Sequence, residues 1–170
     1  GGAHQIDTTR DGMIWMTFTK SEQVIRFDPQ SKAFKVYNGF EKGGNVQYFV
    51  VDADRYVYQD KGGGIWMTHF SREILSRLDP VTGKITVHKT PRTEGLTEKG
   101  VHLYAAVADS QGRLWYTETH GNRLGMLDPA SGETFEFDMP HAHVGPKRLA
   151  IDPDDVLLIP ELATAKLDVA

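Results

Sequence analysis

Histidines and glutamates that could carry proton-transfer and metal chemistry recur at related positions along the chain. His69, Glu118 and Glu161 each lie three residues after a Trp or after the residue that aligns with it, and His4 lies near the N-terminal end. A histidine near neutral pH can take a proton from carbon or from a hydroxyl group. A carboxylate can hold Mg²⁺, which polarises a carbonyl and stabilises a developing enolate. We therefore predict His4 and His69 as catalytic residues and Glu118 and Glu161 as Mg²⁺ ligands.

A second group of histidines lies close together further along the chain. His141 and His143 are separated by one residue, and His120 precedes them. A His-x-His pair on a strand places both rings on one face of the sheet, which suits a metal ion or another ligand. We treat these three residues as a secondary metal or ligand site.

Plainer structural roles are open for all of these side chains. Glu118 and Glu161 fit solvated charges at strand ends, and His69 fits a capping or core histidine. The segment that holds His141 and His143 also fits a polar loop without a ligand.

The elements that must position these residues follow from an internal repeat. Trp15, Trp66 and Trp115 lie 51 and 49 residues apart, and a Gly precedes each Trp by three residues. An Asp-Pro pair follows each Trp by thirteen residues, beginning at Asp28, Asp79 and Asp128. A fourth, degenerate copy begins at Gly145, with Leu158 at the Trp position and Asp155 at the Gly position.

Each copy contains short runs of alternating apolar and polar residues between Gly, Pro and Asp turns, which is typical of β-strands. A period of about 40–50 residues with four strands per copy predicts a blade of a β-propeller. The predicted fold is therefore all-β, a β-propeller segment over 1–170, with blades near 3–38, 46–89, 101–138 and an incomplete one at 147–170. The expected strands are 3–8, 13–18, 23–28 and 33–38, then 46–59, 64–69, 74–79 and 84–89, then 101–108, 113–118, 122–128 and 134–138, then 147–152, 156–161 and 165–169.

The repeated residues have expected structural roles in this arrangement. Each Trp should pack between neighbouring blades, where burial of an indole stabilises the fold by several kcal/mol. The Gly position should form the tight turn between the first two strands of a blade. The Asp before each Pro should accept hydrogen bonds from its own local backbone.

The sequence has about three and three-quarter blades, since the last copy stops before a fourth strand, and an open propeller exposes strand edges. Three arrangements would close the ring. The chain can be a segment of a longer propeller with six to eight blades, two copies can associate into one ring, or the four blades can form a compact ring by themselves.

Composition restricts the classes of function and partner. The formal net charge is −4 and no basic block is present, which argues against a nucleic-acid partner. No apolar run approaches the length of a membrane span. The chain has no Cys, which excludes disulfides, thiolate metal sites and Cys nucleophiles. A periplasmic or secreted location is expected only from the resemblance below, and a cytoplasmic one stays open.

Four strings give the chain a resemblance to a known family. They are GRLWYTE at 112–118, NRLG at 122–125, LDPASG at 127–132 and GPKRLAID at 145–152. They resemble the blade signature of streptogramin B lyase (virginiamycin B lyase)-like propellers, and gluconolactonase-like and NHL-type propellers share parts of it. The resemblance implies a closed propeller and a Mg²⁺-assisted elimination that linearises a cyclic depsipeptide at its ester bond.

The resemblance also implies where functional residues lie. They are a His at the start of an innermost strand and a Glu shortly after the Trp of a second strand. His4 meets the first pattern, and we expect Arg55 or a nearby residue, Tyr104 and Lys147 at the equivalent places in later blades. Phe18, His69, Glu118 and Glu161 occupy the position after the Trp.

Three functions are therefore open. The first is a Mg²⁺-dependent C–O lyase, or a hydrolase, acting on a cyclic depsipeptide or another ester. The second is a non-catalytic propeller that binds a small molecule, peptide, glycan or partner subunit at its channel face. The third is a structural part of a larger assembly. The fold alone does not choose among them.

Overall fold

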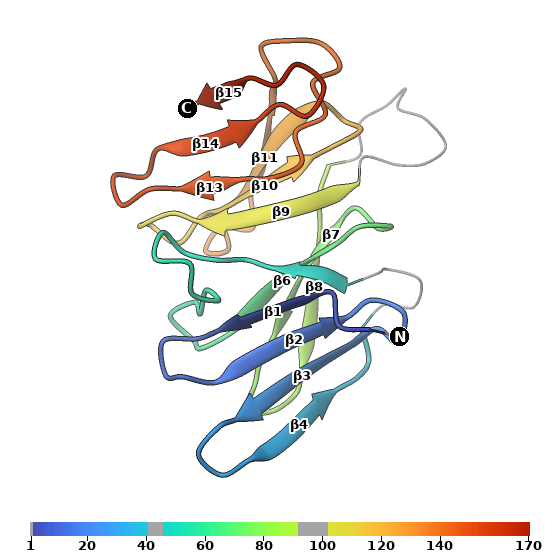
Figure 1. The fold of residues 1–170 in the computed structure, drawn as a ribbon, viewed down its shortest axis with the longest axis vertical. Helices are drawn as coiled ribbons and strands as arrows, with labels where there is room; N and C mark the ends of the chain where they lie inside the picture. Colours follow the sequence, from blue (N-terminus) through green and yellow to red (C-terminus); the bar gives the residue numbers. More distant parts are fainter. Residues whose placement is uncertain (1, 41–45, 92–101) are drawn as a thin grey trace.

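The computed structural model describes residues 2–40, 46–91 and 102–170, which form four antiparallel sheets in chain order (Figure 1). The first sheet contains β1 (Gln5–Thr8), β2 (Ile14–Phe18), β3 (Gln23–Asp28) and β4 (Ala33–Tyr37). The second contains β5 (Val46–Phe49), β6 (Ile65–His69), β7 (Ile74–Leu78) and β8 (Ile85–Lys89). The third contains β9 (Leu103–Ala108), β10 (Leu114–Glu118), β11 (Arg123–Leu127) and β12 (Thr134–Asp138). The fourth has three strands: β13 (Ala150–Ile151), β14 (Leu157–Pro160) and β15 (Leu167–Val169).

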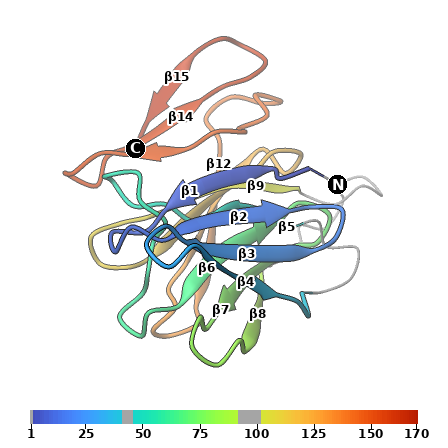
Figure 2. The ribbon, with the colours of Figure 1, turned by 60° about the horizontal axis from the view of Figure 1, so that its bottom comes forward.

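The strands of each sheet follow one another in sequence order, as Figure 2 shows for β1 to β4. The first strands of the four sheets are neighbours in space, with β1 next to β5, β5 next to β9 and β9 next to β13. This arrangement confirms the predicted all-β fold. In the part of the chain that the structure describes, no helix is long and apolar enough to span a membrane.

The prediction of one strand over 46–59 is wrong in its second part, because β5 ends at Phe49. Asp52 Oδ1 accepts hydrogen bonds from the backbone N–H groups of Asp54 and Tyr56, both at 3.1 Å, and Arg55 takes a left-handed φ of 68°. This turn reverses the chain, because a side-chain acceptor two residues back competes with ladder pairing. The chain then returns to donate a backbone hydrogen bond from Val57 to Thr8 in the first sheet.

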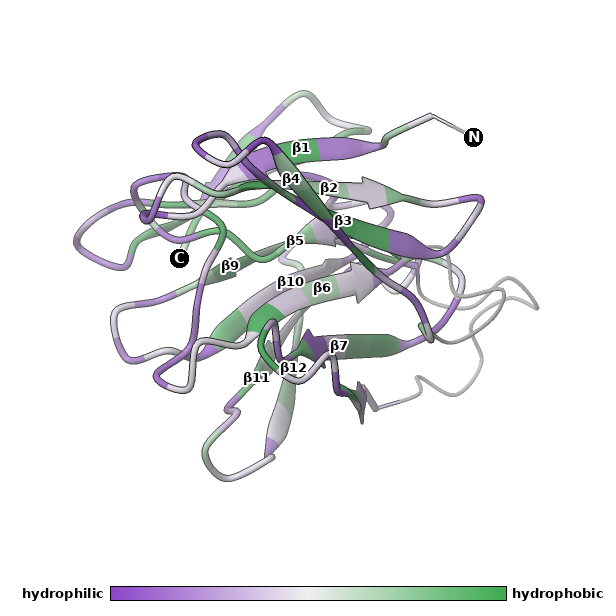
Figure 3. Cartoon of the chain, turned by 90° about the horizontal axis from the view of Figure 1, so that it is seen from below, coloured by the Kyte–Doolittle hydropathy of each residue, from purple (hydrophilic) through white to green (hydrophobic). Residues whose placement is uncertain are grey.

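The main core lies between the sheets. Trp15 and Trp66 are about 1% exposed, and each packs in a cluster that includes residues of the next sheet, such as Phe49 for Trp15 and Leu103 for Trp66. Trp115 is partly buried and packs against the cluster that joins the third and fourth sheets. The expected interblade role of the three Trp residues is confirmed. Figure 3 shows hydrophobic residues along strands such as β7 and β9 and mainly hydrophilic loops.

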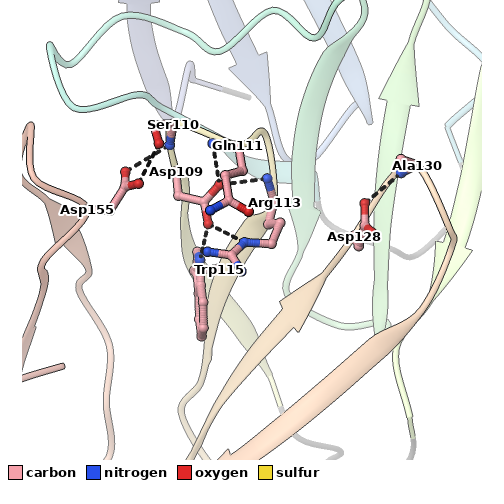
Figure 4. A network of polar contacts seen from close by, with 8 residues as sticks. All are labelled: Asp109, Ser110, Gln111, Arg113, Trp115, Asp128, Ala130 and Asp155. Atoms are coloured by element: carbon pink, nitrogen blue, oxygen red, sulfur yellow. Dashed lines mark hydrogen bonds and ion pairs between the residues drawn. The ribbon is translucent and has the colours of Figure 1, made fainter.

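A polar group six residues earlier holds the indole of each Trp in place. Asp109 Oδ2 accepts hydrogen bonds from Trp115 Nε1 at 3.0 Å and from Arg113 Nε at 2.6 Å (Figure 4). Its other oxygen accepts the backbone N–H groups of Gln111 and Arg113. One carboxylate therefore shapes the turn between β9 and β10 and orients the Trp.

The turn residues behave as the repeat predicts. Gly12, Gly63 and Gly112 have φ of 81°, 76° and 84°, and Asp155 has φ of 64° at the same position of the fourth sheet. Each of the four donates a backbone hydrogen bond to the residue three before it. The Asp residues before Pro also accept local backbone N–H groups, at Asp28, Asp79 and Asp128.

Three buried threonines each join one of the first three sheets to the first strand of the next sheet or to the segment that leads into it. Thr17 Oγ1 donates to the carbonyl of Gln47 at 2.7 Å, and Thr68 Oγ1 donates to that of Tyr104 at 2.8 Å. Thr117 Oγ1 makes the equivalent bond to the carbonyl of Lys147 at 3.3 Å. These contacts align Gln47, and not Arg55, with Tyr104 and Lys147. The sequence prediction placed Arg55 at this position wrongly. The turn at Asp52 adds residues between the innermost strand and Trp66, so counting back from Trp66 stops short of the start of that strand.

Candidate functional site

A row of aromatic rings crosses the first three sheets at the end where the innermost strands begin. Neighbouring ring centroids along the row lie 4.1–6.0 Å apart. We call this row the aromatic arc, and its members in spatial order are His4, Tyr48, Tyr104, Phe70, His102 and His120. The two histidines at its ends, His4 and His120, are exposed.

Two cations from the fourth repeat lie over the tyrosines of the arc. Lys147 Nζ lies 4.8 Å from the ring centroid of Tyr104, and Arg148 Cζ lies 5.1 Å from that of Tyr48 and 5.6 Å from that of Tyr104. The hydroxyl of Tyr48 donates to that of Tyr104 at 2.8 Å. Burial, with this hydrogen bond, holds the pKa of Tyr48 above its ordinary value. Tyr48 therefore keeps its proton, and the rings of both tyrosines face positive charge.

A cavity of about 620 Å³ adjoins this region between the innermost strands. Its walls include Gln5 and Asp7 of β1, Tyr48 of β5, and the guanidinium-bearing residues Arg55 and Arg148. Such a concave space with apolar walls and a few polar groups suits a small ligand. The arc and the cavity share Tyr48, so one ligand can touch both.

The two predicted catalytic histidines lie in different surroundings. His4 is exposed, its backbone N–H donates to the Thr17 carbonyl at 2.8 Å, and its ring meets Tyr48 edge-on at 4.8 Å. His69 ends β6 and is fully buried, with Nε2 at 2.7 Å from Ser76 Oγ. Burial lowers the pKa of His69 to about 4, which keeps its ring neutral. Of the two, His4 is the one that solvent and a ligand can reach.

Glu118, predicted as a Mg²⁺ ligand, is a buried carboxyl group at the end of β10. It is fully buried, and neither of its side-chain oxygens has a hydrogen-bond partner. Burial raises the pKa of Glu118 to about 8, the nearby charge of Glu136 adds to this, and Arg123 opposes it. The group is therefore protonated near neutral pH, and a protonated carboxyl is a poor metal ligand.

Glu161, the second predicted Mg²⁺ ligand, belongs to a cluster with His141 and Asp168. One oxygen of its fully buried carboxylate lies 3.0 Å from His141 Nδ1, and the other accepts a hydrogen bond from Thr164. The bond from Thr164 holds the pKa of Glu161 below its ordinary value, whereas burial and Glu161 raise that of Asp168. One ligand atom from each of His141, Glu161 and Asp168 lies within 4.8 Å of the others.

The sequence interpretation missed Asp168. In the pairing of β14 with β15, Asp168 lies opposite Ile159, two residues before Glu161. Side chains two residues apart on a strand share a face, so Asp168 and Glu161 point to the same side of the fourth sheet. That alternation was readable in the sequence, but the register of so short a strand was not.

Of the three histidines of the predicted secondary site, two stay together in the structure and His141 lies apart from them. His120 and His143 line a second cavity of about 520 Å³, next to Asn122. His141 instead pairs with Glu161. Asn122, which the sequence interpretation also missed, accepts the backbone N–H of Val144 at 2.8 Å and donates to the His141 carbonyl at 2.8 Å. It therefore fixes the segment that carries these histidines.

The cluster of His141, Glu161 and Asp168 could hold a metal ion, and it is the one such group of three found among the described residues. Its imidazole nitrogen suits Zn²⁺ or Mn²⁺ better than Mg²⁺, which prefers oxygen ligands and retained waters. Glu118 does not join a group of this kind. The donors at Glu118 and Glu161 therefore do not fit Mg²⁺ well, and no chemical step is derived through that ion.

Consecutive four-stranded antiparallel sheets whose first strands line a common cavity define part of a β-propeller. Comparison with solved structures supports the propeller fold. A catalytically inactive variant of virginiamycin B lyase from Staphylococcus aureus with quinupristin has a TM-score of 0.81 at 20% identity, over 98% of this chain and 51% of that one. A streptogramin B lyase structure has a TM-score of 0.79 at 22% identity, over 99% of this chain and 54% of that one.

Other propellers are also similar. A protein of unknown function from Bacteroides caccae has a TM-score of 0.65 at 9% identity, over 94% of this chain and 56% of that one. No protein-family model and no curated protein matches the chain. The chain thus has a propeller fold similar to that of these lyases and spans about half their length. Identities this low establish the fold alone.

Proposed function

We propose that the chain provides about half of a ligand-binding β-propeller whose ligand lies on the aromatic arc. The observation that carries the proposal is the stacking of Lys147 and Arg148 over Tyr104 and Tyr48 beside the cavity of the innermost strands. Aromatic faces offer apolar contact, and the cations attract carbonyl or carboxylate oxygens. A peptide or depsipeptide with aromatic side chains combines these features.

The reaction that we propose for this site is elimination at an ester. The imidazole of His4 takes a proton from a carbon atom, and the bond between the neighbouring carbon and the ester oxygen breaks. The products are a carbon–carbon double bond and a carboxylate, and His4 then returns the proton to solvent or to the carboxylate, so the overall reaction is an isomerisation. Lys147 and Arg148 stabilise the carboxylate. The similarity to streptogramin B lyases supports this reaction class, which is also what the sequence resemblance implies.

A non-catalytic binding propeller is the second candidate. The burial of His69 and Glu118 favours it, because these two groups, both predicted for chemistry, lie out of reach of a ligand. In this case the same arc binds a peptide or glycan, and His4 contributes one more ring to the surface. Both candidates bind the ligand at the same face, but only the first converts it.

Quinupristin is the probe that separates them. The intact protein is titrated with quinupristin by calorimetry, and the mixture is then analysed by liquid chromatography and mass spectrometry. Elimination opens the ring with no change in mass, whereas hydrolysis adds the mass of one water. Binding without conversion favours the non-catalytic candidate, and the absence of both overturns the proposal for this class of ligand.

Matched variants assign the roles. Tyr104→Ala and Lys147→Ala should each weaken binding about tenfold, since each removes a stacking or cation–π partner. His4→Gln should abolish conversion and leave the dissociation constant within about threefold. Val81→Ala, at a side chain that is 85% exposed in a distant turn, serves as the control and should change neither quantity.

A further inference from the structure

We propose that His141, Glu161 and Asp168 form a divalent-metal site. The metal ion would link the fourth sheet to the segment between β12 and β13, which carries His141. The site takes a metal that accepts both imidazole nitrogen and carboxylate oxygen, of the Zn²⁺ or Mn²⁺ class. The inference does not rest on the proposed ligand or reaction at the aromatic arc.

Three separate segments deliver the ligands. His141 lies between β12 and β13, Glu161 directly follows β14, and Asp168 lies in β15. The hydrogen bond from the backbone N–H of Ala163 to the Val144 carbonyl, at 3.1 Å, holds the first two segments together. The pairing of Pro160 with Leu167 and of Ile159 with Asp168 sets the position of the third. The backbone therefore positions all three donors without a metal ion.

The cluster has the dimensions of a coordination sphere. Metal–ligand bonds of about 2.0–2.2 Å place ligand atoms on opposite sides of one ion roughly 4 Å apart. One donor atom from each of the three residues lies within 4.8 Å of the others, and His141 Nδ1 lies 3.0 Å from Glu161 Oε1. Small side-chain rotations are enough to bring the three donors onto one ion.

A second observation, independent of the grouping, points to a ligand. The side chain of Glu161 is fully buried, and Asp168 Oδ2 is a buried oxygen that accepts no hydrogen bond from an N–H group, because the Asp168 side chain faces the Glu161 carboxyl group instead. Buried polar atoms without a partner are rare in folded proteins and call for an explanation, such as an ion. Two carboxyl groups held this close together repel each other when both are ionised, and a divalent cation would offset that repulsion. His141 is 48% exposed, so an ion can enter from solvent and retain water ligands.

A metal ion bound at this site would stabilise the fourth sheet in particular. Its first strand, β13, has two residues, and β15 has three. Leu167 and Val169 of β15 are 57% and 63% exposed, so few apolar contacts with the described residues hold β15 in place. A metal bound between the three segments would stabilise the folded state alone, because the unfolded chain does not hold the ligands together.

The experiment is a Zn²⁺ titration of the intact, chelator-treated protein by calorimetry, combined with thermal unfolding with and without the ion. We expect one ion per chain at this site and a rise in Tm at saturation. Asp168→Asn and His141→Gln should each weaken Zn²⁺ binding at least tenfold and remove most of the rise in Tm. Mg²⁺ at the same concentration should produce a much smaller rise.

Two controls separate the site from other causes. His143→Gln removes an exposed histidine two residues from His141, and it should leave Zn²⁺ binding unchanged. Circular dichroism of Asp168→Asn, a substitution of nearly equal shape, checks that the variant folds. Equal Zn²⁺ affinity in Asp168→Asn and the parent protein, or no binding by the parent, would overturn the proposal. A larger rise with Mg²⁺ than with Zn²⁺ would overturn the assigned metal class.

Discussion

The indole Nε1 of Trp66 donates a 2.8 Å hydrogen bond to Oδ2 of Asp60, six residues earlier in the chain. The same carboxylate receives the guanidinium of Arg77 through both oxygens and accepts the backbone N–H of Gly64. The indole thus buries its apolar surface between two sheets while its one polar atom keeps a partner. Trp115 repeats the arrangement with Asp109, and Trp15 uses the hydroxyl of Thr9.

Replacement of Asp60 by Asn should destabilise the fold by about 1–3 kcal/mol, because charged hydrogen bonds to Arg77 and Trp66 are lost. Burial raises the pKa of Asp60, but the bonds from Arg77, Gly64 and Trp66 outweigh it and hold the pKa at about 2. A lowered folded-state pKa gives stability that is present above pH 4 and is lost as the pH falls towards 2. Urea unfolding between pH 2 and 7 measures the difference. The difference in the free energy of unfolding between the parent protein and Asp60→Asn should shrink at low pH. The same difference for Asp54→Asn, whose side chain is 59% exposed, should stay near zero throughout.

Replacement of Trp66 by Ala should cost about 3–5 kcal/mol in the free energy of unfolding. The side chain is 1% exposed and packs between the second and third sheets, so its removal leaves a cavity there. Chemical denaturation followed by circular dichroism provides the measurement, with Val81→Ala as the surface control. A cost below about 1 kcal/mol would contradict the interblade packing.

Replacement of Thr68 by Val should cost about 1–2 kcal/mol, since it deletes a buried donor to the Tyr104 carbonyl at nearly constant side-chain shape. Thr68→Ser keeps the hydroxyl and should recover much of that loss. Thr86→Val, on the exposed face of β8, should change stability by less than about 0.5 kcal/mol. Equal stability of the Val variant and the parent would show that this interblade bond adds nothing.

Glu118 should make the protein less stable as the pH rises. A folded-state pKa of about 8, well above the ordinary 4.5, means that the folded protein keeps a proton that the unfolded chain releases. The associated stability is present below pH 4.5 and is lost as the pH rises to 8, a change of roughly 2–4 kcal/mol. Glu118→Gln should flatten this part of the curve, whereas Glu133→Gln, at an exposed turn, should leave it unchanged.

The same measurement tests the predicted Mg²⁺ role of Glu118. A bound ion would favour the ionised carboxylate and remove the loss of stability at high pH. We expect the curve of the parent protein to be the same with and without Mg²⁺. A stabilisation by Mg²⁺ at pH 8 that disappears in Glu118→Gln would instead establish Glu118 as a ligand.

The sequence by itself determined the repeat and therefore the sheets. The spacing of Trp15, Trp66 and Trp115, with a Gly three residues earlier, predicted the second strand of each sheet and the turn before it, because these are local properties of the backbone. Asp155 was correctly aligned with the Gly positions for the same reason, as Asp tolerates a positive φ. His4 was correctly placed at the start of an innermost strand.

The tertiary structure alone decided which side chains meet. Glu118 and Glu161 occupy equivalent positions, yet one is an unpartnered buried carboxyl and the other contacts His141. The difference arises from segments packed against each strand end, and no periodicity encodes those contacts. Likewise, the arc from His4 to His120 joins rings of three sheets whose residues are far apart in the chain. Only interblade packing brings them together.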